Sequence, residues 1–176
     1  FAFCNTGIES IKIPDGVKII KENAFYNCKN LKEVHLSNSI KEIEFFAFCN
    51  TGIESIKIPD GVKIIKENAF YNCYNLKEVT LPNSIKEIEK YAFSNTGIES
   101  IKIPDGVKII ENNAFYNCYN LKEVTLPNSI KEIEKYAFSN TGIESIKIPD
   151  GVKIIENNAF SNCKNLKEVT LPNSIK

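Results

Sequence analysis

The stretch AFYNCYNLKEVTLPNSI, residues 69–85, decides the fold because it recurs along the chain. It returns at 114–130 and, with small edits, at 24–40 and 159–175. The period is 45 residues, and self-similarity at a fixed period is typical of repeat architectures. We therefore expect a single solenoid built from four repeats: 1–45, 46–90, 91–135 and 136–176.

Each repeat divides again into two halves with one skeleton. The first half, from residue 2, reads A-F-x-N-T-G-I-x-x-I-x-I-P, and the second half, from residue 24, reads A-F-x-N-C-x-N-L-x-x-V-x-L. The halves are 22 and 23 residues long, and we call them the short coil and the long coil. About eight coils are present, and the two types should alternate in shape.

The spacing of apolar residues within a coil predicts its local structure. Ile8-x-x-Ile11-x-Ile13 ends in the alternation typical of a short strand with one buried face. Asp15-Gly16 then predicts a tight turn, and Val17-x-x-Ile20 predicts a second extended pass. A turn, either 3₁₀ or one helical turn, is expected at Ala24-Phe25. A lone coil cannot bury its apolar face, but stacked coils can.

The motif L-x-x-V-x-L-P-x-S-I-x-x-I, together with A-F-x-N-C-x-N, resembles the leucine-rich repeat of the BspA-like type over the whole chain. The resemblance implies an α/β-type, mostly β, right-handed solenoid with a parallel sheet on its concave face. It also implies a surface-exposed or secreted protein of bacteria or parasitic protists that acts in adhesion and protein binding.

Charge and hydropathy exclude several classes of partner. The formal net charge is zero and the pI is about 6.8, which argues against nucleic acid and against electrostatic docking to an anionic membrane. No apolar run is long enough for a membrane span, so no direct membrane insertion is expected in this segment. The pattern begins mid-repeat and shows no recognisable capping coil, so we expect a piece of a longer array.

Equivalent residues of successive coils should stack in columns. The phenylalanines of the A-F pair predict a core spine, and the asparagines two residues later predict an inward ladder whose amides satisfy backbone groups. A third column alternates threonine and cysteine, with Cys73 following Thr51; its cysteines lie two coils apart, too far for a disulfide. Cys4 and Cys49 occupy a different column, and its exchange to serine at Ser94 predicts a surface or half-exposed position.

Two exposed surfaces are candidates for binding a partner. The concave face should present two polar rows, with candidate contacts at Lys12, Glu33, Lys57, Glu78, Thr80, Lys102, Glu123, Thr125 and Lys147. It lacks the aromatic anchors of a strong interface, so it could equally be a solvated sheet face. Beside the Asn-Cys turns, a second candidate patch consists of Tyr71, Tyr74, Tyr116 and Tyr119.

The chain shows no catalytic constellation. It has one histidine, no paired acid cleft, no phosphate-binding loop and no C-x-x-C pair, so we expect no enzyme activity, no cofactor and no metal site. Two functions remain open. One is an extracellular or cell-surface adhesion module that binds a host, matrix or surface protein, or a glycan. The other is a structural repeat that associates end to end into a rod, stalk or fibre.

Overall fold

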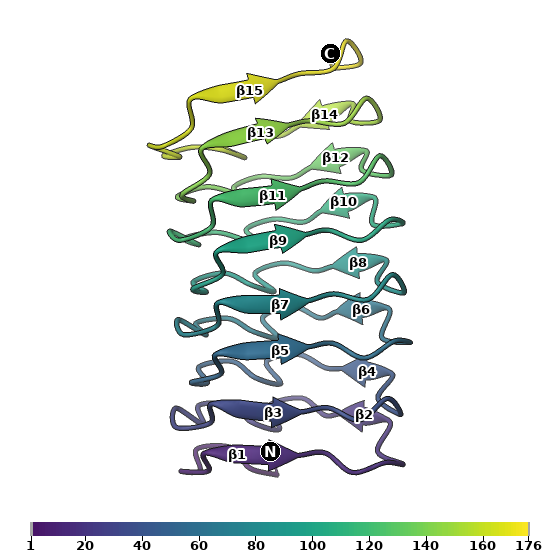
Figure 1. The fold of residues 1–176 in the computed structure, drawn as a ribbon, viewed down its shortest axis with the longest axis vertical. Helices are drawn as coiled ribbons and strands as arrows, with labels where there is room; N and C mark the ends of the chain where they lie inside the picture. Colours follow the sequence, from purple (N-terminus) through teal and green to yellow (C-terminus); the bar gives the residue numbers. More distant parts are fainter. Residues whose placement is uncertain (1, 176) are drawn as a thin grey trace.

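The structure, a computed structural model that describes residues 2–175, is a rod of stacked coils (Figure 1). Each complete coil contributes one three-residue strand and one two-residue strand, and no residue between 2 and 175 is helical. The three-residue strands are β1 (Ser10–Lys12), β3 (Glu33–His35), β5 (Ser55–Lys57), β7 (Glu78–Thr80), β9 (Ser100–Lys102), β11 (Glu123–Thr125), β13 (Ser145–Lys147) and β15 (Glu168–Thr170). The two-residue strands are β2 (Ile19–Ile20), β4 (Glu42–Ile43), β6 (Ile64–Ile65), β8 (Glu87–Ile88), β10 (Ile109–Ile110), β12 (Glu132–Ile133) and β14 (Ile154–Ile155).

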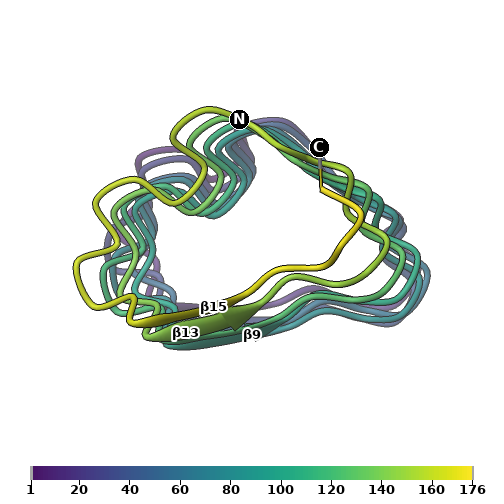
Figure 2. The same ribbon diagram turned by 90° about the horizontal axis from the view of Figure 1, so that it is seen from above.

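The rod has three sides in cross-section (Figure 2). The odd-numbered strands form the first side and pair in parallel as β1-β3, β5-β7, β9-β11 and β13-β15. The even-numbered strands form the second side, a parallel sheet of seven strands in coil order. The third side consists of the turns that begin at each Ala-Phe pair. The predicted leucine-rich repeat solenoid is confirmed, and the turn expected at Ala24-Phe25 is present, in neither the 3₁₀ nor the α-helical conformation.

The two kinds of step between coils are not equivalent. From a short coil to the next long coil, the Lys77 amide donates to the Glu54 carbonyl at 2.9 Å, and three residue pairs of β5 and β7 align. From a long coil to the next short coil, the Glu54 amide reaches the Lys32 carbonyl at 3.3 Å, and β4 and β6 align through one pair only. The 45-residue repeat is therefore more tightly bonded internally than it is to the next repeat at the β4–β6 and β8–β10 steps, whereas β12 and β14 align through two pairs.

The extra residue of the long coil lies at the looser step. It lengthens the turn before the strand, and the Lys29 carbonyl faces Gly52 of the next short coil. A Cβ at Gly52 would collide with that carbonyl, and Gly97 faces the Tyr74 carbonyl in the same way. Glycine is needed there because the two backbones approach too closely for a side chain.

The phenylalanine spine is confirmed. From Phe3 to Phe160 the eight rings stack with centroids 5.2–5.5 Å apart and planes within 10° of parallel. The six rings from Phe25 to Phe138 are fully buried. Burial of one such ring stabilises the fold by roughly 2–3 kcal/mol before entropy is counted.

The asparagine column has a different role from the one predicted. All eight residues, from Asn5 to Asn162, take the left-handed conformation with φ of 57–60°, which asparagine tolerates better than other residues with a side chain. Their side chains are half-buried or exposed, and the Asn27 amide donates to Asn5 Oδ1 at 2.7 Å rather than to backbone. The inward ladder was wrong because the backbone amide of Asn27 already donates to the Cys49 carbonyl of the next coil.

The threonine–cysteine column forms a buried hydrogen-bonded stack. The Cys73 thiol donates to the Phe48 carbonyl at 3.0 Å, and Thr51 Oγ1 lies 3.2 Å from Cys73 Sγ. All six cysteines are free thiols, as the spacing predicted. Burial raises the pKa of Cys73 and of Cys118 to about 11, so both remain protonated at neutral pH.

In the second cysteine column, Cys49, Ser94 and Ser139 are buried, contrary to the prediction, whereas Cys4 in the first coil is half-exposed. Cys49 and Ser94 are 2% and 0% exposed because each small residue lies between half-buried tyrosines of the neighbouring coils, Tyr71 among them. Burial and the neighbouring Cys73 raise the pKa of Cys49 to about 12. The exchange of cysteine for serine therefore reflects a limit on size and not exposure to water.

Candidate binding surfaces

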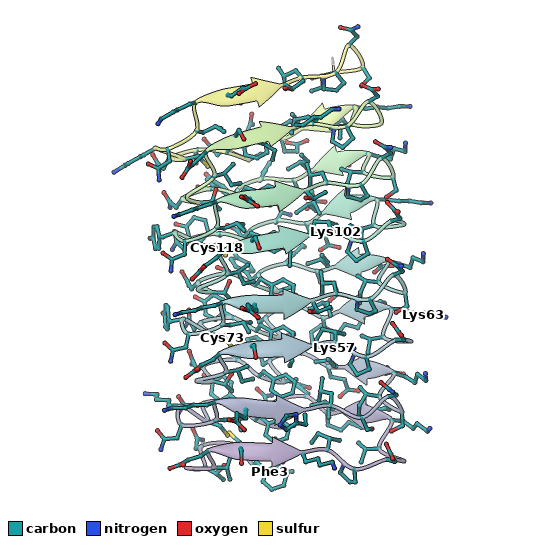
Figure 3. All side chains as sticks on the ribbon, viewed as in Figure 1. Phe3, Lys57, Lys63, Cys73, Lys102 and Cys118 are labelled. Carbon is teal, nitrogen blue, oxygen red and sulfur yellow. The ribbon has the colours of Figure 1, made fainter. Side chains whose placement is uncertain are left out.

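The strand face, which we define as the exposed side chains of β1, β3, β5, β7, β9, β11, β13 and β15, presents two polar rows. One row alternates serine and glutamate, and the other carries lysine in every short coil and threonine or His35 in the long coils. Every candidate on this face is exposed: Lys12, Glu33, Lys57, Glu78, Thr80, Lys102, Glu123, Thr125 and Lys147. Figure 3 labels Lys57 and Lys102 at the ends of their strands on this side of the rod.

Two hollows lie at the ends of these strands, both at the looser step between repeats. Thr80 and Lys102 line one, with a volume of about 360 Å³, together with Pro104. Thr125 and Lys147 line the equivalent hollow of about 290 Å³ one repeat further on, with Pro149 in the same place. The structure thus brings together, in each hollow, a threonine and a lysine that the sequence analysis placed in different coils.

The tyrosine patch divides into two kinds of side chain. Tyr74 and Tyr119 are 66% exposed each, as predicted. Tyr71 and Tyr116 are only half-buried and cover the cysteine–serine column, and Tyr71 packs edge-on against Tyr91 with centroids 6.3 Å apart. Only the first pair is free to anchor a partner, because the second pair already packs within the rod.

The second sheet contains charged columns that the sequence analysis did not single out. Just before the even strands, the exposed residue is lysine in every coil: Lys18, Lys41, Lys63, Lys86, Lys108, Lys131 and Lys153. Just after the strands, a column begins with lysine–glutamate pairs and ends in glutamates alone, namely Lys21, Glu44, Lys66, Glu89, Glu111, Glu134 and Glu156. Aligning the short and long coils position by position would have revealed both columns.

The column of residues just after the even strands changes in charge along the rod. In the second repeat, Lys66 pairs with Glu89 at 3.0 Å. In the third repeat the equivalent residue is Glu111, whose pKa is raised by partial burial and by the neighbouring carboxylates of Glu134 and Glu89. Each glutamate of the long coils is held in place by a backbone amide; the Asn112 amide, for example, donates to Glu134 Oε2 at 3.0 Å.

Neither a group of metal-ligating side chains nor a membrane-spanning helix is found among the described residues. Among residues 2–175, no three histidine, cysteine, aspartate or glutamate side chains are grouped closely enough to hold a metal ion. The same part of the chain contains no helix with the length and apolarity to cross a bilayer.

Comparison with known proteins agrees with the fold. The model of the BspA type leucine rich repeat region matches residues 1–119 and 86–176, so the chain belongs to this family of repeats. No curated protein sequence gives a match. A leucine-rich repeat protein from Bacteroides ovatus superposes with a TM-score of 0.72 at 28% identity over 100% of this chain and 63% of its own.

Two further solved structures are similar. A leucine rich cell surface protein from Faecalibacterium prausnitzii has a TM-score of 0.63 at 29% identity, over 98% of this chain and 64% of that one. The T. pallidum leucine rich repeat protein has a TM-score of 0.68 at 29% identity, over 94% of this chain and 71% of that one. The chain therefore spans less than two thirds of the first two. Its solenoid fold is of a kind that is typically non-catalytic and that generally mediates protein interactions.

Proposed function

We propose that this chain is a non-catalytic adhesion module of a cell-surface or secreted protein, and that its strand face contacts a protein partner. The observation that carries the proposal is the unbroken pair of exposed polar rows along eight strands, with the hollows at Thr80–Lys102 and Thr125–Lys147. The extracellular location is supported by the Faecalibacterium prausnitzii relative, which is described as a cell surface protein.

The charges of the strand face suggest how a partner would be selected. Its lysines lie one repeat apart, with serine–glutamate pairs such as Ser55 and Glu78 beside them. Rim charges of this kind act mainly on association rate and specificity, and the exposed Tyr74 and Tyr119 supply the aromatic contact area. The partner we infer is a protein with a flat polar surface.

Binding to a panel of purified extracellular-matrix proteins and to intact cells tests this function. We expect saturable micromolar binding by the labelled chain, lost in the variant Lys57→Glu, Lys102→Glu, Lys147→Glu. The matched control, Lys63→Glu, Lys86→Glu, Lys108→Glu, changes the same charge on the second sheet and should keep protein binding. Absence of binding, or equal loss in both variants, would refute the role of the strand face.

A structural rod is the second candidate, and it is supported by the regularity of the stacking. The rings of the phenylalanine spine repeat at 5.2–5.5 Å, and every turn forms the same backbone bonds, such as Phe48 amide to Ala69 carbonyl at 2.9 Å. This register allows coils to be added without limit. Sedimentation velocity over a wide concentration range would show end-to-end growth, and a monomer at every concentration would exclude it.

A further inference from the structure

The short and long coils share one position whose residue type has no structural explanation. Five positions are identical in every coil between residues 2 and 175: the alanine and phenylalanine of the A-F pair, the asparagine, the lysine before each even strand and the isoleucine within it. Four of these have a structural reason. The alanine, phenylalanine and isoleucine positions lie in the core through most of the rod, and the asparagine supplies the left-handed turn. The lysine has none of these roles, because it is exposed in all seven coils.

The lysine column, which we define as Lys18, Lys41, Lys63, Lys86, Lys108, Lys131 and Lys153, is joined by backbone hydrogen bonds within each of the first three repeats and at the step from Lys131 to Lys153. The Lys41 amide donates to the Lys18 carbonyl at 2.7 Å, and the Lys86 and Lys131 amides do the same to Lys63 and Lys108. The side chains of bonded neighbours therefore start at about the strand spacing of 4.8 Å. In Figure 3 the labelled Lys63 projects from the edge of the rod.

No ion pair among residues 2–175 accounts for the lysine column. The ion pairs among residues 2–175 join Lys21 to Glu44 and Lys66 to Glu89, and neither includes a lysine of the column. Like charges opposite one another on parallel strands repel. The stems of Lys41 and Lys86 lie over Gly61 and Gly106, so packing explains only part of the column. A feature that breaks a local stability rule in every coil is expected where function requires it.

The residues that follow each lysine of the lysine column indicate which class of anion could bind beside it. It alternates isoleucine in the short coils with glutamate in the long coils: Ile19, Glu42, Ile64, Glu87, Ile109, Glu132 and Ile154. Ile109 and Ile154 are 39% and 46% exposed. Isoleucine offers an apolar surface to the C–H face of a sugar ring, and a glutamate carboxylate accepts hydrogen bonds from sugar hydroxyls.

Two hollows place these groups together. Lys41 and Lys63 line one of about 440 Å³ with Ile64 and Glu42, and Lys86 and Lys108 line its counterpart of about 360 Å³ one repeat further on. Lys66 and Glu44 also line the first hollow, and Glu111 lines the second. Each hollow therefore combines at least two lysines with two glutamates and an isoleucine that is at least partly exposed, so ammonium groups, hydrogen-bond acceptors and apolar surface lie side by side. Neither hollow is lined by an aromatic side chain on which nucleic-acid bases could stack.

We propose that the lysine column binds a linear anionic polysaccharide laid along the rod, with its sulfate or carboxylate groups on successive ammonium groups and its sugar rings over the isoleucines. This site goes beyond the proposed function, because it lies on the second sheet and not on the strand face. One array could therefore hold a protein and a charged glycan at the same time.

Titration of the whole chain with a heparin-derived decasaccharide at several salt concentrations tests the proposal. We expect micromolar binding at low salt that weakens as the salt concentration rises. The slope of the logarithm of the binding constant against the logarithm of the salt concentration should fall in magnitude by about 0.7 for each lysine removed. The variant Lys63→Gln, Lys86→Gln, Lys108→Gln should bind about 10-fold or more weakly and lose about 2 from that slope. The matched variant Lys57→Gln, Lys102→Gln, Lys147→Gln should stay within about two-fold of the parent.

Other outcomes would overturn the proposal. These are no decasaccharide binding at low salt, equal weakening in both triple variants, or equally tight binding of single-stranded DNA of matched charge. A neutral dextran of the same length should not bind. Thermal melts confirm that each variant is folded, and loss of glycan binding with retained protein binding separates this site from the strand face.

Discussion

The second and third repeats, residues 46–90 and 91–135, differ at four positions, so each serves as a control for the other. Phe46 and Tyr91 share the left-handed conformation, with φ of 54° and 56°. Cys49 becomes Ser94 in the core, and Lys66 with Glu67 becomes Glu111 with Asn112 on the second sheet. The fold tolerates all four exchanges. Ser94 leaves a buried hydroxyl without a hydrogen-bond partner, and Glu111 places like charges together where the second repeat has an ion pair. The backbone is thus fixed by shared columns, while the differences act locally.

The largest expected effect should be equal in the two repeats. Phe70→Ala and Phe115→Ala each remove one ring from the buried spine, and we expect each to lower the free energy of unfolding by about 3–5 kcal/mol. Urea denaturation followed by circular dichroism measures both. Tyr74→Ala, at a side chain 66% exposed, should change it by less than about 0.5 kcal/mol. A clear inequality between the two phenylalanine variants would mean that the repeats differ in packing.

The glycine at the looser step gives the next largest effect. Gly97→Ala should destabilise by about 1–3 kcal/mol, because the new methyl group meets the Tyr74 carbonyl. Gly7→Ala is the matched control, since its nearest neighbour, Asn30 Nδ2, is 3.9 Å away. Denaturant midpoints measure both, and equal loss in the two variants would contradict the role assigned to this contact.

Substitutions at Cys49 and Ser94, the buried position that differs between the two repeats, should change stability in opposite directions. Ser94 Oγ is the one buried side-chain oxygen or nitrogen without a hydrogen bond among the described residues, whereas a thiol tolerates the same place at Cys49. We expect Ser94→Cys to stabilise by about 1 kcal/mol and Cys49→Ser to destabilise by a similar amount. Thermal melting measures both, and a stabilising Cys49→Ser would refute this account.

The smallest effect concerns the charge exchange and depends on pH. The raised pKa of Glu111 means that the folded state holds its proton more tightly than the unfolded state does. Stability from this residue is therefore lost as pH rises from the ordinary glutamate range through the raised value. Glu111→Gln should stabilise by about 0.5 kcal/mol at pH 7, with the gain vanishing below the ordinary glutamate pKa. Denaturation at several pH values checks this, and Glu67→Gln in the second repeat should show no such gain.

Much of the fold followed from the sequence because the repeat constrains it. The period gave the solenoid, and the L-x-x-L-x-L spacing gave the three-residue strands, because alternation on a buried face admits few other structures. The phenylalanine spine and the unpaired thiols of the Thr51–Cys73 column were predicted for the same reason. Stacking in register turns a one-dimensional pattern into columns.

The misassigned residues are those whose environment depends on a neighbouring coil. Cys49 looked exposed because serine replaced it, yet tyrosines from the coils on either side cover it. The asparagine column looked inward, yet φ and not burial selects asparagine there. The candidate binding residues on the strand face are exposed, but exposure does not distinguish a contact surface from a solvated one, so their role remains a prediction.

The unequal steps between coils have a mechanical consequence. Under tension between its termini, the rod should yield first where only one residue pair links β4 to β6 and β8 to β10. The corresponding step from β12 to β14 aligns through two pairs and should yield later. Each event would release one 45-residue unit, which extends to roughly 150 Å of chain. A stalk of this kind would lengthen in steps under shear, and each step would dissipate energy while the remaining repeats stay folded.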